Sequence, residues 1–165
     1  MRASFIYCLA FVALLCSFTS CQKERVDPFD PVAQAAADDA LILEYLKKDG
    51  YTNYTKTASG LYYVQIQAGT NPQAQNGNTV QIHYIGRFLN GEIFESSYHS
   101  GNPFTFKVGA GAAIKGWDEG VTYMQKGEKA RLYIPSALAY GRYGNSNIPG
   151  NAVLVFDMEV IKVTQ

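Results

Sequence analysis

The fold is decided by residues 114–124, which read IKGWDEGVTYM. Apolar residues recur there at helical spacing, at Ile114, Trp117, Val121 and Met124. Gly127 follows just beyond the segment, as is typical of the end of a helix. The sequence therefore predicts one short helix inside a domain that otherwise has the pattern of strands.

Runs with a period of two precede and follow this helix. Five of them alternate apolar with polar residues: Tyr62/Val64/Ile66, Val80/Ile82/Tyr84, Phe104/Phe106/Val108, Ala130/Leu132/Ile134 and Leu154/Phe156/Met158/Val160. This alternation is typical of an antiparallel sheet buried on one face, and the residues from Gly69 to Asn78 read as turns. The predicted fold class is α+β, a curled antiparallel β-sheet of about five strands wrapped around one short helix.

An N-terminal helical extension is expected over residues 31–59, which also include a linker. Asp30 followed by Pro31 is a favourable helix start, because aspartate caps free N–H groups and proline lacks one. The pairs Leu41/Tyr45 and Ile42/Leu46 continue the helical period up to residues 47–50, which read KKDG. We expect this helix to pack on the domain, and a dimerisation arm is the alternative.

The first twenty residues read as a leader peptide. Arg2 precedes an apolar stretch from Phe5 to Leu15 that is short for a membrane span. The following residues 18–21, FTSC, resemble the lipobox of bacterial lipoproteins, although Phe18 stands where leucine is usual. The resemblance implies a signal peptide over residues 1–20, a lipidated Cys21 and a tether over residues 21–30. An ordinary cleaved signal or an uncleaved helix is the alternative.

This resemblance implies an exported protein, anchored by lipid to the outer membrane of the bacterial cell envelope on its periplasmic or surface side. Acyl chains on Cys21 would supply a stable membrane anchor. No cysteine follows Cys21, which excludes disulfides, thiol catalysis and zinc–thiolate sites from residues 22–165. The 165 residues carry 14 basic and 14 acidic side chains, so a nucleic-acid partner is not expected.

The strand and helix patterns coincide with four ordered motifs. They are residues 77–86 (GNTVQIHYIG) with 90–97 (NGEIFESS), residues 103–106 (PFTF), residues 113–120 (AIKGWDEG), and residues 139–141 (AYG) leading to 148–149 (IP) and 154–157 (LVFD). In this order the motifs resemble FKBP-type peptidyl-prolyl cis/trans isomerases. The resemblance covers Gly60 to Val163, within a predicted isomerase domain of residues 60–165.

The resemblance implies an aromatic pocket as the active site. Carried over by position, its catalytic residues are Tyr84, Phe94, Glu95, Tyr140 and Phe156, and its substrate-binding residues are Phe104, Ala113, Ile114, Trp117 and Ile148. Trp117 would form the floor, while the Tyr140 hydroxyl and the Ile114 N–H would donate to substrate carbonyls. Glu95 departs from the aspartate that is usual at its position.

The implied reaction is isomerisation of X-Pro bonds in exported proteins during folding, without a metal or cofactor. Partners implied by the family are proline-containing polypeptides and macrolide inhibitors. A peptide-binding chaperone module with little catalysis is the main alternative, favoured by Glu95, and a purely structural display domain is another. Hydrolysis by Ser96 or Ser97 with His99 is disfavoured, because no acid stands at a matching spacing.

Overall fold

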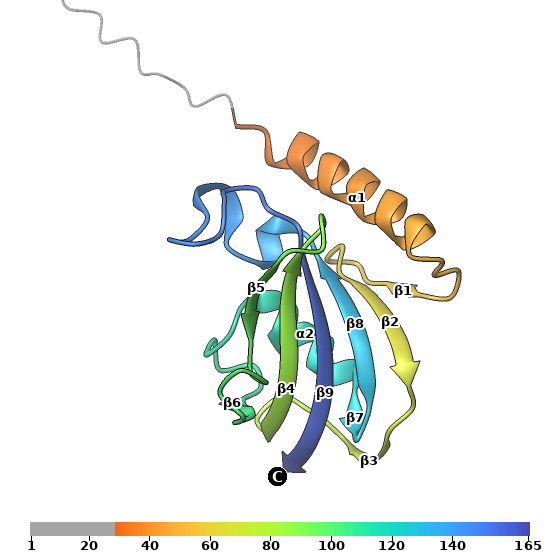
Figure 1. The fold of residues 1–165 in the computed structure, drawn as a ribbon, viewed down its shortest axis with the longest axis vertical. Helices are drawn as coiled ribbons and strands as arrows, with labels where there is room; N and C mark the ends of the chain where they lie inside the picture. The colour runs from red at the N-terminus through yellow and green to blue at the C-terminus, as the bar shows by residue number, and fades with distance from the viewer. Residues whose placement is uncertain (1–28) are drawn as a thin grey trace, which may run out of the picture.

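The computed structural model describes residues 29–165, which form a curved sheet with a helix on each face (Figure 1). The expected signal peptide of residues 1–20 and the lipidated Cys21 lie outside these residues. Among the described residues, no helix is both long and apolar enough to cross a membrane.

Helix α1 spans Pro31–Lys48, as the capping pattern predicted. The Asp30 carboxylate accepts hydrogen bonds from the N–H groups of Val32 at 2.8 Å and Ala33 at 3.2 Å. Two lysines occupy the last turn, where they oppose the negative end of the helix dipole, and Gly50 follows with a φ of 79°. Local sequence therefore determines both ends of α1.

Seven strands form one antiparallel sheet in the order β1-β2-β8-β9-β4-β5, with β6 also paired to β4. Their bounds are β1 Thr55–Lys56, β2 Tyr62–Gln67, β4 Thr79–Phe88, β5 Ile93–Ser96, β6 Phe104–Lys107, β8 Lys129–Ile134 and β9 Leu154–Thr164. The five predicted runs correspond to β2, β4, β6, β8 and β9. The other two strands, β1 and β5, have 2 and 4 residues, too few to show a clear alternation.

A second sheet of two strands lies where turns were expected. It pairs β3, Thr70–Gln73, with β7, Gln125–Lys126. Pro72 lies inside β3 and lacks the N–H that a central strand needs, so the sequence argued against a strand here. The prediction of turns throughout residues 69–78 was therefore wrong at β3.

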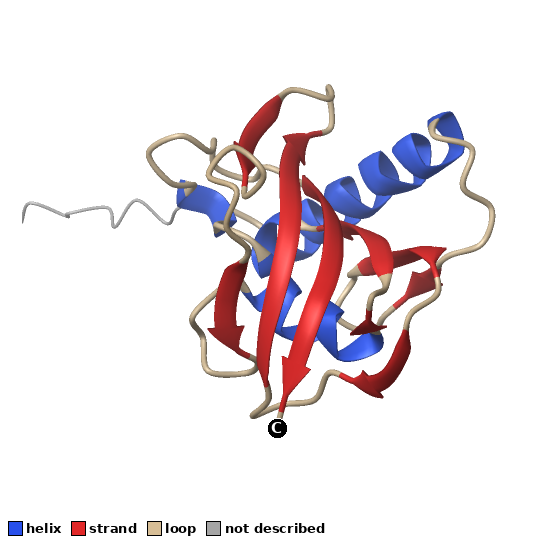
Figure 2. Cartoon of the chain, turned by 60° about the horizontal axis from the view of Figure 1, so that its bottom comes forward, coloured by secondary structure: helices blue, strands red, loops and turns tan. Residues whose placement is uncertain are grey.

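The predicted short helix packs against the concave face of the sheet. Helix α2 spans Lys115–Gly120 and continues as a 3-10 turn over Val121–Tyr123, behind the long strands in Figure 2. Gly116 and Gly120 face β8 so closely that a methyl group on either would overlap an isoleucine or leucine side chain of that strand. These glycines let α2 pack closely against β8.

Helix α1 covers part of the opposite, convex face. There Ile42 and Leu46 pack with Tyr62, Tyr133 and neighbouring valines in a second cluster. The first three residues of β2, Tyr62, Tyr63 and Val64, are therefore all buried, since α1 covers one side and the main core covers the other. The prediction of a sheet buried on one face was wrong at this end of the sheet.

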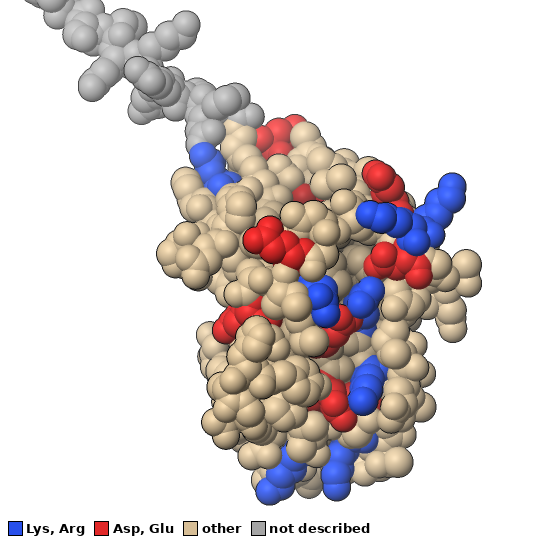
Figure 3. All heavy atoms as spheres, in the orientation of Figure 1, with Lys and Arg blue, Asp and Glu red and all other residues tan. Residues whose placement is uncertain are grey.

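The rest of the convex face carries a network of ion pairs. Asp157 on β9 accepts hydrogen bonds from Arg131 at 2.6 and 3.1 Å and from Arg87 at 3.3 Å. Arg131 also reaches Asp49, just after α1, at 3.1 Å. Figure 3 shows acidic and basic side chains interleaved along this face. Ion pairs therefore connect β4, β8, β9 and the end of α1 across the convex face.

Candidate functional site

A cavity of about 170 Å³ opens between the concave face of the sheet and the start of α2. The residues that line it are Tyr84, Glu95, Phe104, Ala112, Ala113, Ile114, Trp117, Tyr140 and Phe156. They come from β4, β5, β6, β9, α2 and the loops that precede α2 and follow β8. Eight of the ten sequence-predicted site residues thus meet at one cavity. Ala112 is an additional lining residue that the motif comparison did not single out.

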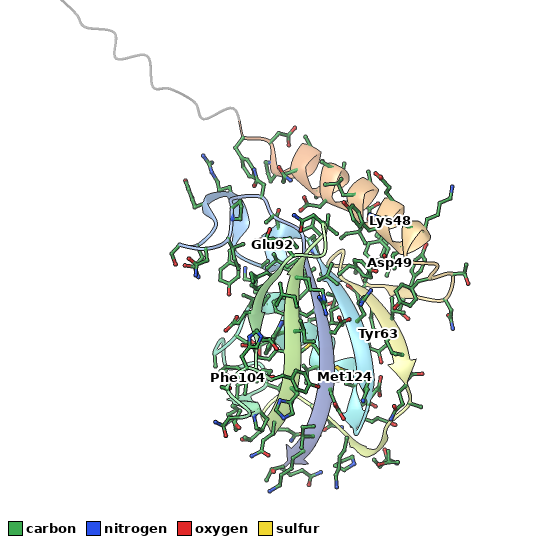
Figure 4. All side chains as sticks on the ribbon, viewed as in Figure 1. Lys48, Asp49, Tyr63, Glu92, Phe104 and Met124 are labelled. Carbon is green, nitrogen blue, oxygen red and sulfur yellow. The ribbon has the colours of Figure 1, made fainter. Side chains whose placement is uncertain are left out.

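Trp117 lies at the centre of the aromatic wall. The centroid of its ring lies 4.7 Å from that of Tyr84, 5.1 Å from Phe156 and 5.9 Å from Phe104, each at a steep interplanar angle of 75–89°. Edge-to-face packing of this kind favours one fixed arrangement of the rings. Phe104 is the most exposed of the four, and Figure 4 shows it at the β6 edge. The wall is therefore rigid at its base and accessible at its rim.

Two tyrosine hydroxyls and one carboxylate supply polar groups at this cavity. Burial raises the pKa of Tyr84, and the hydrogen bond and negative charge of Glu95 raise it further. Burial also raises the pKa of Tyr140, as does Glu95, against a smaller opposing effect from Asn145. Both phenols consequently stay protonated at neutral pH and are able to donate hydrogen bonds.

The backbone at Ile114 provides another donor. Ile114 is the N-cap of α2, and its carbonyl accepts from Trp117 and Asp118. Its own N–H makes no hydrogen bond to any of residues 29–165. A cavity lined by rings, with this N–H and the Tyr140 hydroxyl at its edge, suits an apolar ring flanked by carbonyl groups.

Asp118 positions the loop that leads into Ile114. Its carboxylate accepts the N–H of Gly109 at 2.8 Å and that of Gly111 at 3.1 Å. Both glycines have positive φ, at 77° and 70°, which residues with a side chain rarely adopt. Asp118 was not predicted to have a role, although an acid in the first turn of a predicted helix after two nearby glycines is a usable signal.

Two predicted site residues do not line the cavity. The Phe94 ring lies over Gly86 and meets Phe156 at 5.6 Å, so it supports the wall from behind. Ile148 is 7% exposed and belongs to the main hydrophobic core. Motif position thus assigned both residues to the pocket wall, whereas the structure places Phe94 behind the wall and Ile148 in the core.

His83 and Ser97 approach each other outside the cavity, at 3.0 Å between Nδ1 and Oγ. Ser97 is buried, and its Oγ also bonds the backbone N–H and carbonyl of Tyr84. The His83 ring stacks on Tyr98 at 4.6 Å. This pair ties β4 to β5, and a hydroxyl held in this way is not available as a nucleophile. Within residues 29–165, no group of three or more His, Cys, Asp or Glu side chains is arranged to hold a metal ion.

Comparison with known families agrees with the architecture of the cavity. A family model described as FKBP-type peptidyl-prolyl cis-trans isomerase matches residues 70–161. FK506-binding protein 2 of Dictyostelium discoideum is 49% identical over 92 residues, which cover 55% of this chain and 69% of that protein. FK506-binding protein 4 of Emericella nidulans is 40% identical over 133 residues, 81% of this chain and 28% of that protein.

Solved structures give the same result. FkpA from Escherichia coli superposes with a TM-score of 0.69 at 35% identity, covering 81% of this chain and 62% of that one. A peptidyl-prolyl cis-trans isomerase from Pseudomonas syringae superposes with a TM-score of 0.69 at 29% identity, covering 83% and 98%. The chain spans only 28–58% of the length of several relatives, such as FK506-binding protein 4 and the Arabidopsis thaliana isomerase FKBP15-2.

Proposed function

The chain belongs to the family of FKBP-type peptidyl-prolyl cis-trans isomerases, and from this premise we propose that its concave cavity accelerates rotation about X-Pro bonds in polypeptides. The observation that carries the proposal is the convergence of a fixed aromatic wall with two donors, the Tyr140 hydroxyl and the Ile114 N–H, at one cavity.

The chemistry needs no group beyond these. Rotation about the amide bond faces a barrier of about 18–20 kcal/mol, because resonance is lost in the twisted state. The planar amide has more charge separation between oxygen and nitrogen than the twisted amide has. An apolar cavity therefore disfavours the ground state relative to the transition state, and each ~1.4 kcal/mol of this difference gives a tenfold rate increase.

Each part of the cavity has a distinct task in this mechanism. Tyr84, Trp117 and Phe156 hold the proline ring and exclude water from the amide. The Tyr140 hydroxyl and the Ile114 N–H bind the flanking carbonyls, which fixes the chain on both sides of the rotating bond. Glu95 accepts from Tyr84 and keeps that ring oriented at the rim.

The test is exchange between cis and trans isomers of a proline-containing peptide, measured by NMR with catalytic amounts of the full chain. We expect faster exchange that is suppressed by a macrolide competing for the cavity. Unchanged exchange would contradict the proposal. Macrolide binding without any acceleration would instead support a peptide-binding chaperone module. The carboxylate of Glu95 at the rim of the cavity favours this second function.

Tyr140→Phe removes one of the two donors and leaves the ring in place. We expect kcat/KM to fall by about five- to thirtyfold, the effect of one hydrogen bond worth roughly 1–2 kcal/mol. Tyr143→Phe is the matched control, because Tyr143 belongs to the same loop and is 83% exposed. Equal activity of the two variants would remove Tyr140 from the mechanism.

The proposed setting is the bacterial cell envelope, where the enzyme would assist folding of exported proteins. This proposal rests on the lipobox-like residues before Cys21 and on the apolar stretch from Phe5 to Leu15. Labelled palmitate should enter the full chain in bacterial cells, and Cys21→Ser should abolish both the label and membrane association. An unlabelled wild-type chain would contradict lipid anchoring without affecting the proposed isomerase activity.

A further inference from the structure

The loop of residues 135–143 lies between α1 and the isomerase cavity. Ser136, Ala137, Gly141 and Arg142 line a separate, largely apolar cavity of about 190 Å³, whose opposite wall is α1 and the residues just before it. Tyr140 of the same loop lines the isomerase cavity instead. Figure 1 shows this loop below the N-terminal half of α1. A single short segment therefore borders both the helix and the isomerase cavity.

Asp38 of α1 binds this loop directly. Its side chain is almost fully buried, and Oδ2 accepts both the Ser136 N–H at 2.8 Å and the Ser136 hydroxyl at 2.7 Å. The other oxygen, Oδ1, accepts from Gln34 Nε2 at 2.7 Å. The carboxylate is thus held on both sides, and its direction toward Ser136 is fixed.

The bond to Ser136 replaces a missing helix cap. Residues Ser136–Leu138 form a 3-10 helix whose N-cap is Pro135, which has no side-chain acceptor to close the first turn. Asp38 provides that acceptor from 98 residues away in the sequence. Because one carboxylate oxygen accepts both the N–H and the hydroxyl of Ser136, Asp38 holds the first residue of this short helix in place.

The short helix in turn determines the position of Tyr140. Backbone bonds from Leu138 to Pro135 at 2.9 Å and from Ala139 to Ser136 at 3.0 Å carry the turn up to the residue before Tyr140. On the other side of Tyr140, the guanidinium of Arg142 lies 4.8 Å from the centre of the Phe29 ring, just before α1. The segment with the Tyr140 hydroxyl is therefore held by the N-terminal extension at both ends.

We propose that α1 is part of the catalytic apparatus and that Asp38 is a positioning residue, which acts by holding Tyr140 at the orientation needed to donate to substrate. The helix lies before residues 70–161, so the matched family region does not include it. The expected effect of Asp38 on kcat/KM rests on the proposed isomerase function. The placement of Tyr140 by Asp38 does not depend on that function.

The kinetic test compares Asp38→Ala with Asp39→Ala in the full chain. We expect Asp38→Ala to lower kcat/KM by about three- to tenfold, less than complete loss of the Tyr140 hydroxyl. Asp39 is the control, because it lies on the same helix and lines the same cavity, but its carboxylate binds Tyr62 at 2.6 Å and Lys56 at 2.5 Å instead of the loop. Its substitution should leave kcat/KM within about twofold of wild type.

A double-mutant cycle separates positioning from a general loss of stability. If Asp38 acts through Tyr140, then Asp38→Ala should have almost no further effect on kcat/KM in a Tyr140→Phe background. Equal fold losses in the two backgrounds would overturn the proposal. If Asp38→Ala does not fold, Ser136→Ala takes its place, because it removes the hydroxyl bond and keeps the N–H bond to the carboxylate.

The position of Tyr140 can also be tested by NMR, without an activity assay. An inactive wild-type protein would refute the proposed isomerase function but not the placement of Tyr140 by Asp38. In ¹H–¹⁵N spectra, Asp38→Ala or Ser136→Ala should shift the Tyr140 amide and those next to it, while Asp39→Ala should leave them in place. The Trp117 indole signal should stay unchanged in all three variants. A Tyr140 amide at its wild-type position in a folded Asp38→Ala protein would overturn the proposal.

Discussion

The two faces of the sheet are both rich in aromatic side chains but use them differently. On the concave face, Tyr84, Trp117 and Phe156 pack edge to face around an open cavity. On the convex face, Tyr62 and Tyr133 are fully buried under or beside α1. Aromatic content therefore does not distinguish the proposed catalytic face from the structural one.

The two faces differ in the hydrogen-bond partners of the hydroxyl groups and in the surroundings of the rings. The Tyr62 hydroxyl donates to Asp39 and the Tyr133 hydroxyl to Asp49, each at 2.6 Å, so both hydroxyls are already paired within the chain. On the concave face, α2 covers only part of the sheet and leaves a cavity of about 170 Å³. The concave face is thus distinguished by a cavity walled by aromatic rings and bordered by the Ile114 N–H, which makes no hydrogen bond to any of residues 29–165.

The largest expected effect comes from removing a ring of the concave face. Phe156 is 2% exposed, so Phe156→Ala should destabilise the fold by about 3–5 kcal/mol. It should also lower kcat/KM by roughly ten- to a hundredfold, because the cavity loses a wall and admits water. Chemical denaturation and peptide exchange rates, measured on the same folded sample, give the two numbers.

Phe156→Leu is the control for this variant, since it keeps most of the buried volume but not the ring. We expect it to recover most of the stability and only part of the activity. Wild-type kcat/KM in a folded Phe156→Ala protein would show that the concave wall does not act on the substrate.

A convex-face tyrosine should affect stability alone. Tyr133→Phe removes a partly buried hydrogen bond to the Asp49 carboxylate, which should cost about 0.5–1.5 kcal/mol of the free energy of unfolding. Its kcat/KM should remain that of wild type when assayed below the melting temperature. A loss of activity in proportion to that of Phe156→Ala would erase the distinction between the faces.

Alkaline pH should weaken the convex face by titration. Burial and then the bond to Asp49 raise the pKa of Tyr133 above that of an unfolded tyrosine, about 10. Above pH 10 the unfolded chain therefore loses a proton that the folded chain keeps, and the free energy of unfolding falls by about 1.4 kcal/mol per pH unit from this group. Between pH 9 and pH 11, the free energy of unfolding obtained from denaturation curves should fall more steeply with pH for wild type than for Tyr133→Phe. Equal pH slopes of the two proteins would contradict this expectation.

The smallest effect is expected at the rim of the cavity. Glu95→Gln keeps an acceptor for the Tyr84 hydroxyl but removes the charge that helps to raise the pKa of Tyr84 and Tyr140. We expect kcat/KM to fall by no more than about fivefold, in line with the modest energies of exposed charges. A loss as large as that of Phe156→Ala would make Glu95 a central catalytic group instead of a rim residue.

Much of this arrangement could be predicted from local sequence. The capping residues Asp30 and Pro31 fixed the start of α1, and the helical period of residues 114–124 identified the helix on the concave face. Ordered motifs brought eight predicted residues to one cavity. These features depend on neighbours in the chain or on positions that a motif preserves.

What the sequence did not predict depends on contacts between distant segments. Asp38 is buried against Ser136, and the residues near Asp38 in the sequence do not predict this partner. A usable signal was present, since Asp38 continues the Ile42/Leu46 stripe of α1 by one helical turn, and that stripe is buried whereas Leu41 is exposed. A carboxylate on the buried stripe of a helix indicates a partner elsewhere in the chain.

The most direct test of the difference between the faces is an NMR titration of the full chain with a proline-containing peptide, which reports exchange and binding site together. The account predicts faster cis/trans exchange, with chemical-shift changes at the Trp117 indole and the amides of Ile114 and Tyr140, and none at Tyr62 or Tyr133. Binding that perturbs Tyr62 and Tyr133, or perturbation of the concave face without faster exchange, would contradict it.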